Sequence, residues 1–369
     1  MKSWDIIRIT TRIRKTAEFD DAGKIQMEES MNMHESIPIG IIGTGSIANN
    51  IHLPGLAEME HVSIEAVCDM VEERAEETAR KYKVSRWYSN YRQMLAEEKL
   101  RAVLVLVQPD QAFRIILDCL EQGLDIFVEK PAGITAYQTK TLAKKAREKG
   151  CIVQVGYNRR YIPLVQEVVR IMRETTTITQ VEGCFFKNSS AEFYDGCASA
   201  HECDVVHAID LVRWIAGGSP KAAATLIGQY NSPVPNSWNS IIKFDNDVTG
   251  IIKSNYQTGG RVHSFEIHGY TASAYINLGF AVPDCDARII FHMGKQSYSA
   301  ASAGTGSDEV VYYDGKKMAG SEEYHKYYGY YNEVRQFINC VRTREDPETN
   351  LYDSVHTMEL VEMLANSVI

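Results

Sequence analysis

Between residues 37 and 157, short apolar runs alternate with longer stretches in which apolar residues recur at helical spacing. The apolar runs predict buried strands at 37–42, 62–68, 102–107, 125–128 and 151–155. The stretches between them predict helices that begin at Ser46 and span 71–82, 111–122 and 135–149. Strands that alternate with helices in this way form βαβ units, so this region predicts a parallel sheet with helices on both faces.

After residue 157 the hydrophobic pattern changes. Helices are expected at 164–173 and 204–216, and strand-like segments then follow one another, from "AATLIGQY" and "SIIKFDN" to "ARIIFHM" and "VVYYDG". Gly, Asp, Asn and Pro separate these segments, which is typical of antiparallel strands joined by turns. The segments "YYNEVRQFINCVRTRED" and "DSVHTMELVEMLANSV" near the end are helical again. We therefore predict an α/β protein whose second domain holds one large, mostly antiparallel open sheet.

The first 36 residues share neither pattern. The stretch "MKSWDIIRITTRIRKTAEFDDAGK" is interrupted by charge every few residues and cannot form the apolar core of a signal peptide. We expect residues 1–36 to be a leader that is disordered or wrongly included in the translated sequence. Two domains, 37–157 and 158–369, would follow it.

The motif "GTGSIA" lies between the first predicted strand and the first predicted helix. Its first glycine permits a tight turn, its second lets the backbone approach a pyrophosphate, and its small last residue allows close packing, while the helix start offers unpaired N–H groups. Asp69 ends the next predicted strand, roughly 20 residues further on, where an acidic residue binds the adenosine ribose. The pattern predicts a Rossmann domain with cofactor contacts from Gly43, Thr44, Gly45, Ser46, Ile47, Ala48 and Asp69.

Asp69 also bears on the choice between NAD and NADP. Its carboxylate would repel a phosphate on the ribose, so the sequence favours NAD. Arg74 lies close enough in the sequence to keep NADP open as the alternative.

Composition narrows the range of partners. A formal net charge of −9 and a pI near 5.6 argue against a nucleic-acid or anionic-membrane surface, which needs clustered Lys and Arg. No apolar run approaches the roughly 18 residues that a membrane span requires. The eight cysteines contain no CxxC pair, which favours reduced thiols in the cytoplasm. We therefore expect a small-molecule partner, no nucleic acid and no membrane.

The segment "DIFVEKPAG" carries a family resemblance. Its residues Glu129, Lys130 and Pro131, downstream of the glycine turn, resemble the EKP motif of the glucose-fructose oxidoreductase, inositol dehydrogenase and MocA (Gfo/Idh/MocA) family. The segments "YSNYRQML", "VGYNRRYIP" and "HAIDLVRWIAG" are similar to further segments of that family. The resemblance implies a Rossmann domain, a C-terminal α/β domain with a large open sheet, and NAD(P) between them. It also implies sugars, cyclitols or related polyols as substrates, and a homodimer or homotetramer formed through the sheet.

The same resemblance adds Pro109, Glu129 and Lys130 to the expected cofactor contacts. Oxidation of a secondary alcohol by hydride transfer needs a base for the hydroxyl proton and a group that steadies the oxyanion. Lys130 is the first candidate for this chemistry, and a solvated charge at a strand end is its structural alternative.

His207 is the second catalytic candidate, with a buried structural histidine as the alternative. Asp204 lies three residues before it and Asp210 three after, so either carboxylate can share its helix face and one can orient the imidazole. The family often places its acid four residues before this histidine, where the present chain has Cys203. Whether Asp204 joins a proton relay, or the helix begins differently, therefore stays open.

Arg159, Arg160 and Tyr161, at the start of the second domain, are expected to bind substrate together with His207. Ion-paired scaffolding is the alternative for the arginines. The tyrosines of "YHKYYGYYNEV" form either an aromatic binding strip or a helix lead-in packed on the sheet, and we favour the second interpretation.

Four potential metal ligands lie close together in the sequence: Cys197, His201, Cys203 and His207. Their spacing matches none of the common structural zinc patterns, and hydride transfer needs no metal, so we predict none.

The leading hypothesis is an NAD(P)-dependent oxidoreductase that acts on a secondary alcohol of a sugar, cyclitol or related polyol. An NAD-dependent glycosidase of the same fold would oxidise and re-reduce its sugar in place. A non-catalytic regulator would bind the dinucleotide and a protein partner, but Lys130 and His207 argue against that function.

Overall fold

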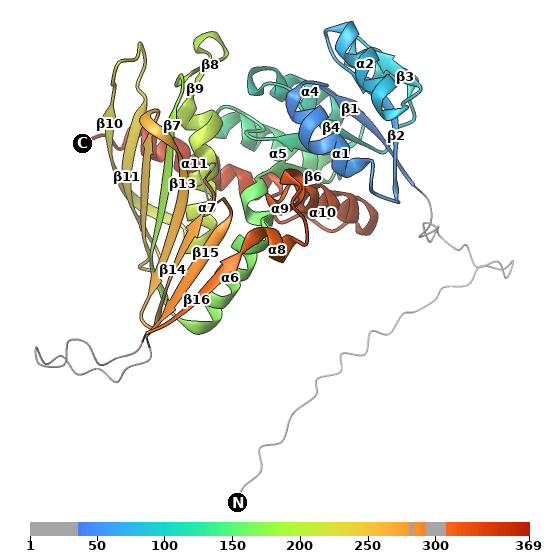
Figure 1. Ribbon diagram of the computed structural model, residues 1–369. Helices are drawn as coiled ribbons and strands as arrows, with labels where there is room; N and C mark the ends of the chain where they lie inside the picture. Colours follow the sequence, from blue (N-terminus) through green and yellow to red (C-terminus); the bar gives the residue numbers. More distant parts are fainter. Residues whose placement is uncertain (1–35, 280–283, 293–307) are drawn as a thin grey trace, which may run out of the picture. The chain divides into compact units, whose positions relative to one another are not determined.

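The computed structural model describes residues 36–279, 284–292 and 308–369 (Figure 1). The expectation of a leader concerns residues that lie, apart from residue 36, outside this described part of the chain.

The first sheet has six parallel strands in the order β3-β2-β1-β4-β5-β6. They are β1 (Ile37–Ile42), β2 (Val62–Cys68), β3 (Arg86–Tyr88), β4 (Ala102–Val105), β5 (Asp125–Glu129) and β6 (Val153–Gly156). This is the strand order of the doubly wound dinucleotide-binding fold, so the predicted parallel sheet is confirmed. The pattern missed β3, because three residues are too few to show a period of two.

The helices of this half cover both faces of the sheet (Figure 1). They are a π-helical turn (Ala48–His52) that continues into α1 (Leu53–Leu56), then α2 (Glu72–Tyr82), α3 (Tyr91–Glu97), α4 (Pro109–Glu121) and α5 (Ala136–Lys149). Successive residues of a strand point to opposite faces, and β4 shows the result. Val103 belongs to the apolar cluster on one face and Leu104 to the cluster on the other.

The second sheet has eight strands in the order β10-β11-β12-β7-β13-β14-β15-β16. They are β7 (Ile178–Asn188), β10 (Pro220–Gly228), β11 (Ser237–Phe244), β12 (Thr249–Asn255), β13 (Gln257–Gly269), β14 (Ala272–Asn277), β15 (Asp286–Phe291) and β16 (Glu309–Asp314). All neighbours pair antiparallel except β12 and β7, which are parallel, so the predicted large and mostly antiparallel sheet is confirmed. The central strand β7 was not predicted. Its Gly183 interrupts the apolar alternation, where a Cβ would lie 3.0 Å from Phe265.

Helices cover one face of this sheet and leave the other open (Figure 1). They are a 3₁₀ turn (Asn158–Tyr161), α6 (Pro163–Thr175), a π-helical turn (His201–Val205), α7 (Val206–Ala216), α8 (Gly315–Ala319), α9 (Tyr324–Tyr327), α10 (Tyr330–Thr343) and α11 (Leu351–Asn366). Helix α7 packs on β7 and β12, α6 on β14 and β15, and α11 on β10. A short hairpin of β8 (Glu192–Phe193) and β9 (Ala198–Ser199) precedes the second π-helical turn.

Two details of the helices differ from expectation. The helix expected over 204–216 starts with the π-helical turn His201–Val205, which changes the direction of the side chains before α7. Helix α10, near the end of the chain, returns to the first sheet, where Phe337 packs on Phe127 with ring centroids 6.0 Å apart.

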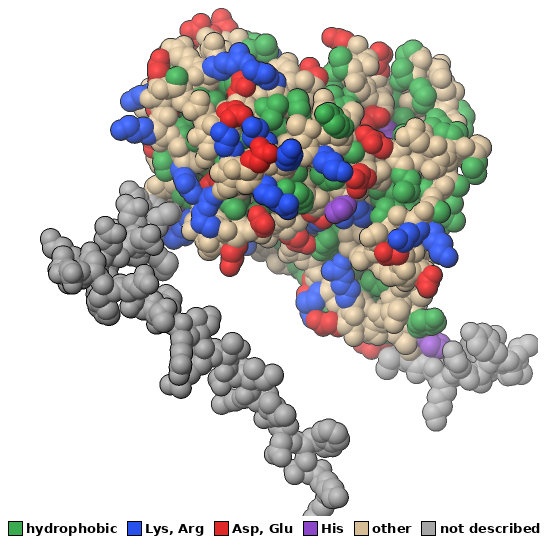
Figure 2. Space-filling model, turned by 180° about the vertical axis from the view of Figure 1, so that it is seen from behind, with side chains coloured by type: hydrophobic (Ala, Val, Ile, Leu, Met, Phe, Trp, Pro, Cys, Tyr) green, Lys and Arg blue, Asp and Glu red, His purple; other side chains and the backbone are tan. Residues whose placement is uncertain are grey.

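The surface agrees with the balanced composition. Figure 2 shows Lys and Arg interspersed with Asp and Glu over the face opposite to that of Figure 1. Within the described ranges, no helix has the length and apolar character needed to cross a membrane.

Candidate active site

The two glycines of the turn after β1 have different roles. Gly43 has a φ of +95°, and a Cβ there would lie 2.5 Å from the carbonyl oxygen of Leu106, so only glycine fits. No atom lies within 4 Å of the position that a Cβ would take at Gly45, which lines a cavity instead. The turn is therefore closed by Gly43 and leaves room for a ligand at Gly45.

A cavity of about 480 Å³ lies at the carboxyl ends of β1, β2 and β4. Gly43, Gly45, Asp69 and Arg74 are among the residues that line it. One oxygen of Asp69 accepts hydrogen bonds from the Thr44 N–H (2.9 Å) and hydroxyl (3.2 Å). The carboxyl ends of the strands are where open α/β sheets bind ligands, so this cavity fits the adenosine half of a dinucleotide.

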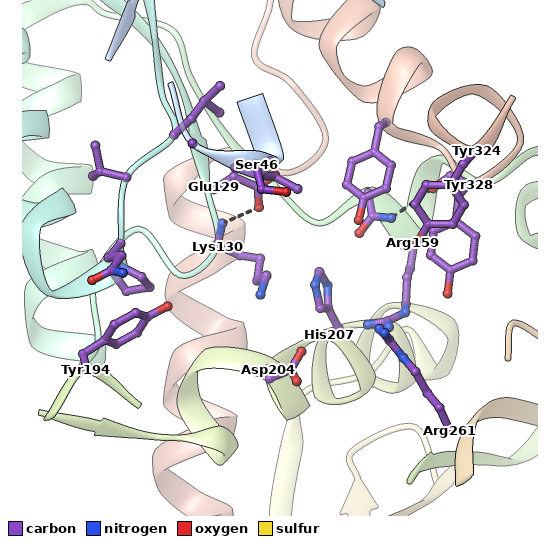
Figure 3. A pocket seen from close by; sticks show the side chains of 18 of the residues that line it. Ser46, Glu129, Lys130, Arg159, Tyr194, Asp204, His207, Arg261, Tyr324 and Tyr328 are labelled. Atoms are coloured by element: carbon purple, nitrogen blue, oxygen red, sulfur yellow. Dashed lines mark hydrogen bonds between the residues drawn. The ribbon is translucent and has the colours of Figure 1, made fainter. Parts of the chain in front are cut away.

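A second cavity, of about 520 Å³, adjoins the first and shares Gly45 and Arg74 with it (Figure 3). The Rossmann half contributes Ser46, Ile47, Pro109, Glu129 and Lys130 to the lining. The other half contributes Asn158, Arg159, Tyr194, Asp204, His207, Arg261, Tyr324, Tyr328 and Tyr330. The continuous space over an open glycine fits a dinucleotide with its nicotinamide end in this second cavity.

Not every predicted cofactor residue lines these cavities. Thr44 and Ala48 are buried, and Ala48 packs in the core beneath the helix start. Thr44 acts through Asp69, whose carboxylate it holds. The remaining eight line one or both cavities: Gly43, Gly45, Ser46, Ile47, Asp69, Pro109, Glu129 and Lys130.

Lys130 follows the last residue of β5 and reaches across the cavity to the second half of the chain. Its Nζ donates a hydrogen bond to the Cys203 carbonyl oxygen at 2.8 Å. An ammonium has three N–H donors, so this bond positions the Lys130 side chain and leaves two donors for other partners. Figure 3 shows the Lys130 side chain and the imidazole of His207 pointing into the same space.

Asp204 lies in the π-helical turn and is held by residues other than His207. Its carboxylate accepts a hydrogen bond from the Tyr256 hydroxyl at 2.6 Å and forms an ion pair with Lys187. Burial opposes ionisation, but the charges of Lys130 and Lys187 and these hydrogen bonds outweigh it and lower the pKa of Asp204 to about 2. Asp204 forms no hydrogen bond with His207. The Nδ1 of His207 is buried and has no hydrogen-bond partner among the described residues.

Asp210, the other candidate to orient His207, belongs to a buried ion cluster. Arg160 donates to it from Nε at 2.8 Å and also contacts Asp353 at 2.7 Å. Arg160 is 1% exposed. The structure thus places Arg160 in the scaffold and not in the cavity lining, contrary to our expectation, because two carboxylates already neutralise it.

Tyr161 is also outside the cavity lining. It is buried, and its hydroxyl donates to the side-chain oxygen of Gln336 at 2.7 Å. Of Arg159, Arg160 and Tyr161, the three residues at the start of the second domain that were expected to bind substrate, only Arg159 lines the cavity.

Arg159 is held against a neutral histidine. Its NH2 lies 3.0 Å from Nδ1 of His263, whose ring stacks on Phe185 with centroids 3.9 Å apart. Burial and the charges of Arg159 and Arg261 lower the pKa of His263 far below its ordinary value. His263 is therefore neutral, and its Nδ1 accepts the hydrogen bond from Arg159.

Several residues of the lining were missed or set aside. The tyrosines of α9 and of the start of α10 pack against the core that covers the second sheet, as in the helix lead-in that we favoured, and Tyr324, Tyr328 and Tyr330 also line the cavity. Tyr194 has a φ of +53°. A positive φ at a bulky residue is a strained conformation that clusters at functional sites, and no sequence signal shows it.

A buried cluster of His52, Glu129 and Glu333 lies behind Lys130. His52 Nε2 is 2.7 Å from a Glu129 oxygen, and Glu333 is 0% exposed. Burial and the negative charge of Glu129 raise the pKa of Glu333 well above its ordinary value. Both effects favour the protonated, neutral form of Glu333.

The sequence cluster considered for zinc is dispersed in the structure. Cys197 is exposed, whereas His201 is buried and its Nε2 lies 3.1 Å from the Val361 carbonyl oxygen. In the part of the chain that the structure describes, the potential ligand atoms of these four side chains do not come together at one point where they could hold a metal ion.

Comparison with protein families agrees with this geometry. Residues 37–157 match the oxidoreductase family with an NAD-binding Rossmann fold, and residues 204–275 match the GFO/IDH/MocA C-terminal domain. The chain belongs to the Gfo/Idh/MocA oxidoreductase family.

Individual relatives are similar over nearly the whole chain. The scyllo-inositol 2-dehydrogenase (NAD(+)) of Bacillus subtilis is 21% identical, over 91% of this chain and 95% of its own. The D-xylose 1-dehydrogenase (NADP(+)) 2 of Haloferax volcanii is also 21% identical, over 89% and 96%. The structure of levoglucosan dehydrogenase in complex with NADH and levoglucosan has a TM-score of 0.76 at 19% identity, over 90% and 97%. The last comparison establishes the likeness in fold.

Proposed function

We propose that this protein is an NAD(P)-dependent dehydrogenase that oxidises a secondary alcohol of a sugar, cyclitol or related polyol. The observation that carries the proposal is the position of Lys130 and His207, which enter one cavity from opposite halves of the chain. That cavity continues into the space above Gly45. The inositol and xylose dehydrogenases among the relatives support the substrate class.

The residues over the first sheet fit a dinucleotide. Gly45 and the helix start at Ser46 would hold the pyrophosphate, and Asp69 would bind the hydroxyls of the adenosine ribose. We favour NAD because of Asp69, with NADP as the alternative because Arg74 lines the same cavity. When bound, the nicotinamide supplies the hydride acceptor.

Lys130 and His207 would manage the proton and the charge on the oxygen. In its deprotonated form, Lys130 would accept the hydroxyl proton at Nζ while a hydride leaves the carbon that bears this hydroxyl and a carbonyl forms. The bond to the Cys203 carbonyl keeps Nζ in place during this transfer. His207 hydrogen-bonds the same oxygen, and the carboxylate of Asp204 stabilises the proton that Lys130 has gained.

The proposal can be tested by a substrate screen. Inositols, pentoses, hexoses and their glycosides would be incubated with NAD and NADP separately, following the absorbance of the reduced nicotinamide. Reduction that continues with a free polyol or sugar is expected. Hydrolysis of a glycoside without net accumulation of the reduced cofactor would contradict the dehydrogenase proposal and favour a glycosidase.

We further propose a cytoplasmic homodimer or homotetramer that forms through the open face of the second sheet. Ile241 on β11 and Tyr312 on β16 lie on this face at 52% and 74% exposure, so apolar side chains are available there for burial in an interface. Light scattering after size exclusion should give a dimer or tetramer that Ile241→Lys dissociates. The control is Tyr137→Lys, at an exposed position on α5. A native monomer would contradict this assembly.

A further inference from the structure

The cavity beside His207 is lined by more cations than anions. Its charged residues are Arg74, Lys130, Arg159 and Arg261 against Glu129 and Asp204. Both carboxylates have partners of their own, since His52 contacts Glu129 and Lys187 pairs with Asp204. Neither of them neutralises Arg159.

Arg159 is the only one of these four cations that is buried. It is 4% exposed, and its Nε and NH1 are buried without a hydrogen-bond partner among the described residues. Its NH2 contacts the neutral His263, its guanidinium lies 5.0 Å from the ring centroid of Phe185, and the Tyr328 hydroxyl is a further, uncharged hydrogen-bond partner. A buried guanidinium without a carboxylate is costly, and a bound anion would remove that cost.

Arg261 strengthens the positive charge at the same place. It lies two residues before His263 on β13, so the two side chains share a face of the sheet. In Figure 3 the guanidinium groups of Arg159 and Arg261 both extend toward the side of the cavity where His207 lies, and both charges act on His263. Two cations in such positions repel each other, and an anion bound between them would turn this repulsion into attraction.

The ionisation of neighbouring groups agrees with a positive cavity. Burial lowers the pKa of Lys187 to about 8 despite its partner Asp204, and the charges of Arg261 and Arg159 add to this effect. The pKa of Asp204 falls to about 2 although burial opposes it. A positive field favours anions and disfavours cations, which is the direction of both shifts.

We propose that the substrate carries an anionic group, which binds Arg159 and Arg261 while its reacting hydroxyl lies at Lys130 and His207. This inference rests on the proposed dehydrogenase function and identifies the substrate class as acidic sugars or acidic polyols. The planar fork of a guanidinium pairs with carboxylates and phosphates, so either group provides the required chemistry. The anion is not the cofactor's own pyrophosphate, because that site is the glycine turn of the other half of the chain.

Paired probes test the inference. Each pair consists of a neutral polyol or sugar and its acid, such as glucitol with gluconate, glucose with glucuronate, and galactose with galacturonate; glucose 6-phosphate provides the phosphate arm. Binding to the NADH-loaded protein would be measured by calorimetry, and oxidation by NAD reduction. We expect at least one acid or phosphate to bind about tenfold or more tightly than its neutral partner. Whether the carboxylates or the phosphate show the larger gain in affinity over the neutral partner identifies the anion.

Variants connect that preference to the two arginines. Arg159→Met and the exposed Arg261→Gln should each reduce the ratio of acid to neutral binding about tenfold. Arg288→Gln, at an exposed position on β15, is the matched control and should leave the ratio unchanged. If Arg159→Met does not fold, Arg261→Gln decides the outcome alone.

The results separate this inference from the proposed function. Equal binding of acids and neutral partners across all pairs would overturn the anionic substrate. A preference for acids that survives in Arg261→Gln would overturn the binding of the anion by the two arginines. Oxidation of neutral polyols with no preference would leave the dehydrogenase standing without it. Anion binding that depends on Arg159 and Arg261, without oxidation of any probe, would support the anion site and count against the dehydrogenase.

Discussion

The two walls of the central cavity are built in different ways. At the glycine turn, the wall of the Rossmann half consists of backbone: Gly43 closes a turn, Gly45 leaves space, and a helix begins at Ser46. The opposite wall consists of charged and aromatic side chains from the 3₁₀ turn Asn158–Tyr161, β13, α9, the start of α10 and the segment around His207. Backbone recognises what every dinucleotide shares, whereas side chains distinguish one substrate from another. The account therefore predicts that changes to the two walls separate cofactor affinity from turnover.

The largest difference between the effect on turnover and the effect on cofactor affinity is expected for a change at His207. His207→Ala should lower kcat by about 10² or more, in the range of acid–base contributions, with little change in the Kd of the cofactor. Steady-state kinetics and cofactor titration would measure the two quantities. His356→Ala, at an exposed position on α11, is the control. Equal losses of folding and turnover in His207→Ala would instead indicate a buried structural histidine.

Asp69 should show the opposite separation. Asp69→Ser removes the acceptor for ribose hydroxyls and the charge that repels a phosphate, so the preference for NAD over NADP should narrow by about 1–3 kcal/mol. Competition titrations with both cofactors would measure it, with the exposed Glu72→Ser as control. Tighter binding of NADP to the native protein would contradict the assignment.

Asp204→Asn should have a smaller effect on catalysis than His207→Ala. The substitution leaves a hydrogen-bond acceptor for Tyr256 but removes the charge that pairs with Lys187. We expect kcat to fall about tenfold, the scale of one hydrogen bond to a charged group. A loss as large as that of His207→Ala would show that Asp204 takes part directly in proton transfer.

The smallest effect concerns stability alone. Because the pKa of Glu333 is raised in the folded protein, the folded state holds a proton that the unfolded state releases once the pH exceeds the ordinary value of 4.5. The free energy of unfolding should then fall as the pH rises, by up to about 1.4 kcal/mol per unit. Glu333→Gln should flatten this dependence between pH 5 and 8 in thermal melts. An unchanged slope, like that expected for the exposed control Glu345→Gln, would contradict a raised pKa of Glu333.

The two walls also differ in how far the sequence predicts them. Gly43, Gly45 and Asp69 form a local pattern whose spacing has one structural meaning. Lys187 and Arg261 come together only because β7 and β13 pair, next to the register shift between Gln257 and Val262. Such a register depends on the packing of the whole sheet and leaves no local signal.

The start of the second domain also shows that the sequence does not predict the surroundings of single residues. Arg159 and Arg160 are neighbours in the sequence, and nothing in the pattern separates them. The fold gives two carboxylates to Arg160 and none to Arg159 among the described residues. Likewise, the π-helical turn His201–Val205 decides where Asp204 points, and helix periodicity does not predict it.

Lys130 offers the most direct test of the central claim that this cavity is a hydride-transfer site. Lys130→Met keeps most of the side chain's volume and removes its proton acceptor. With the substrate found by the screen, kcat should fall by at least about 10² while the Kd of the cofactor stays close to native, and Lys140→Met, at an exposed position on α5, should match the native enzyme. Near-native kcat in Lys130→Met would contradict the account.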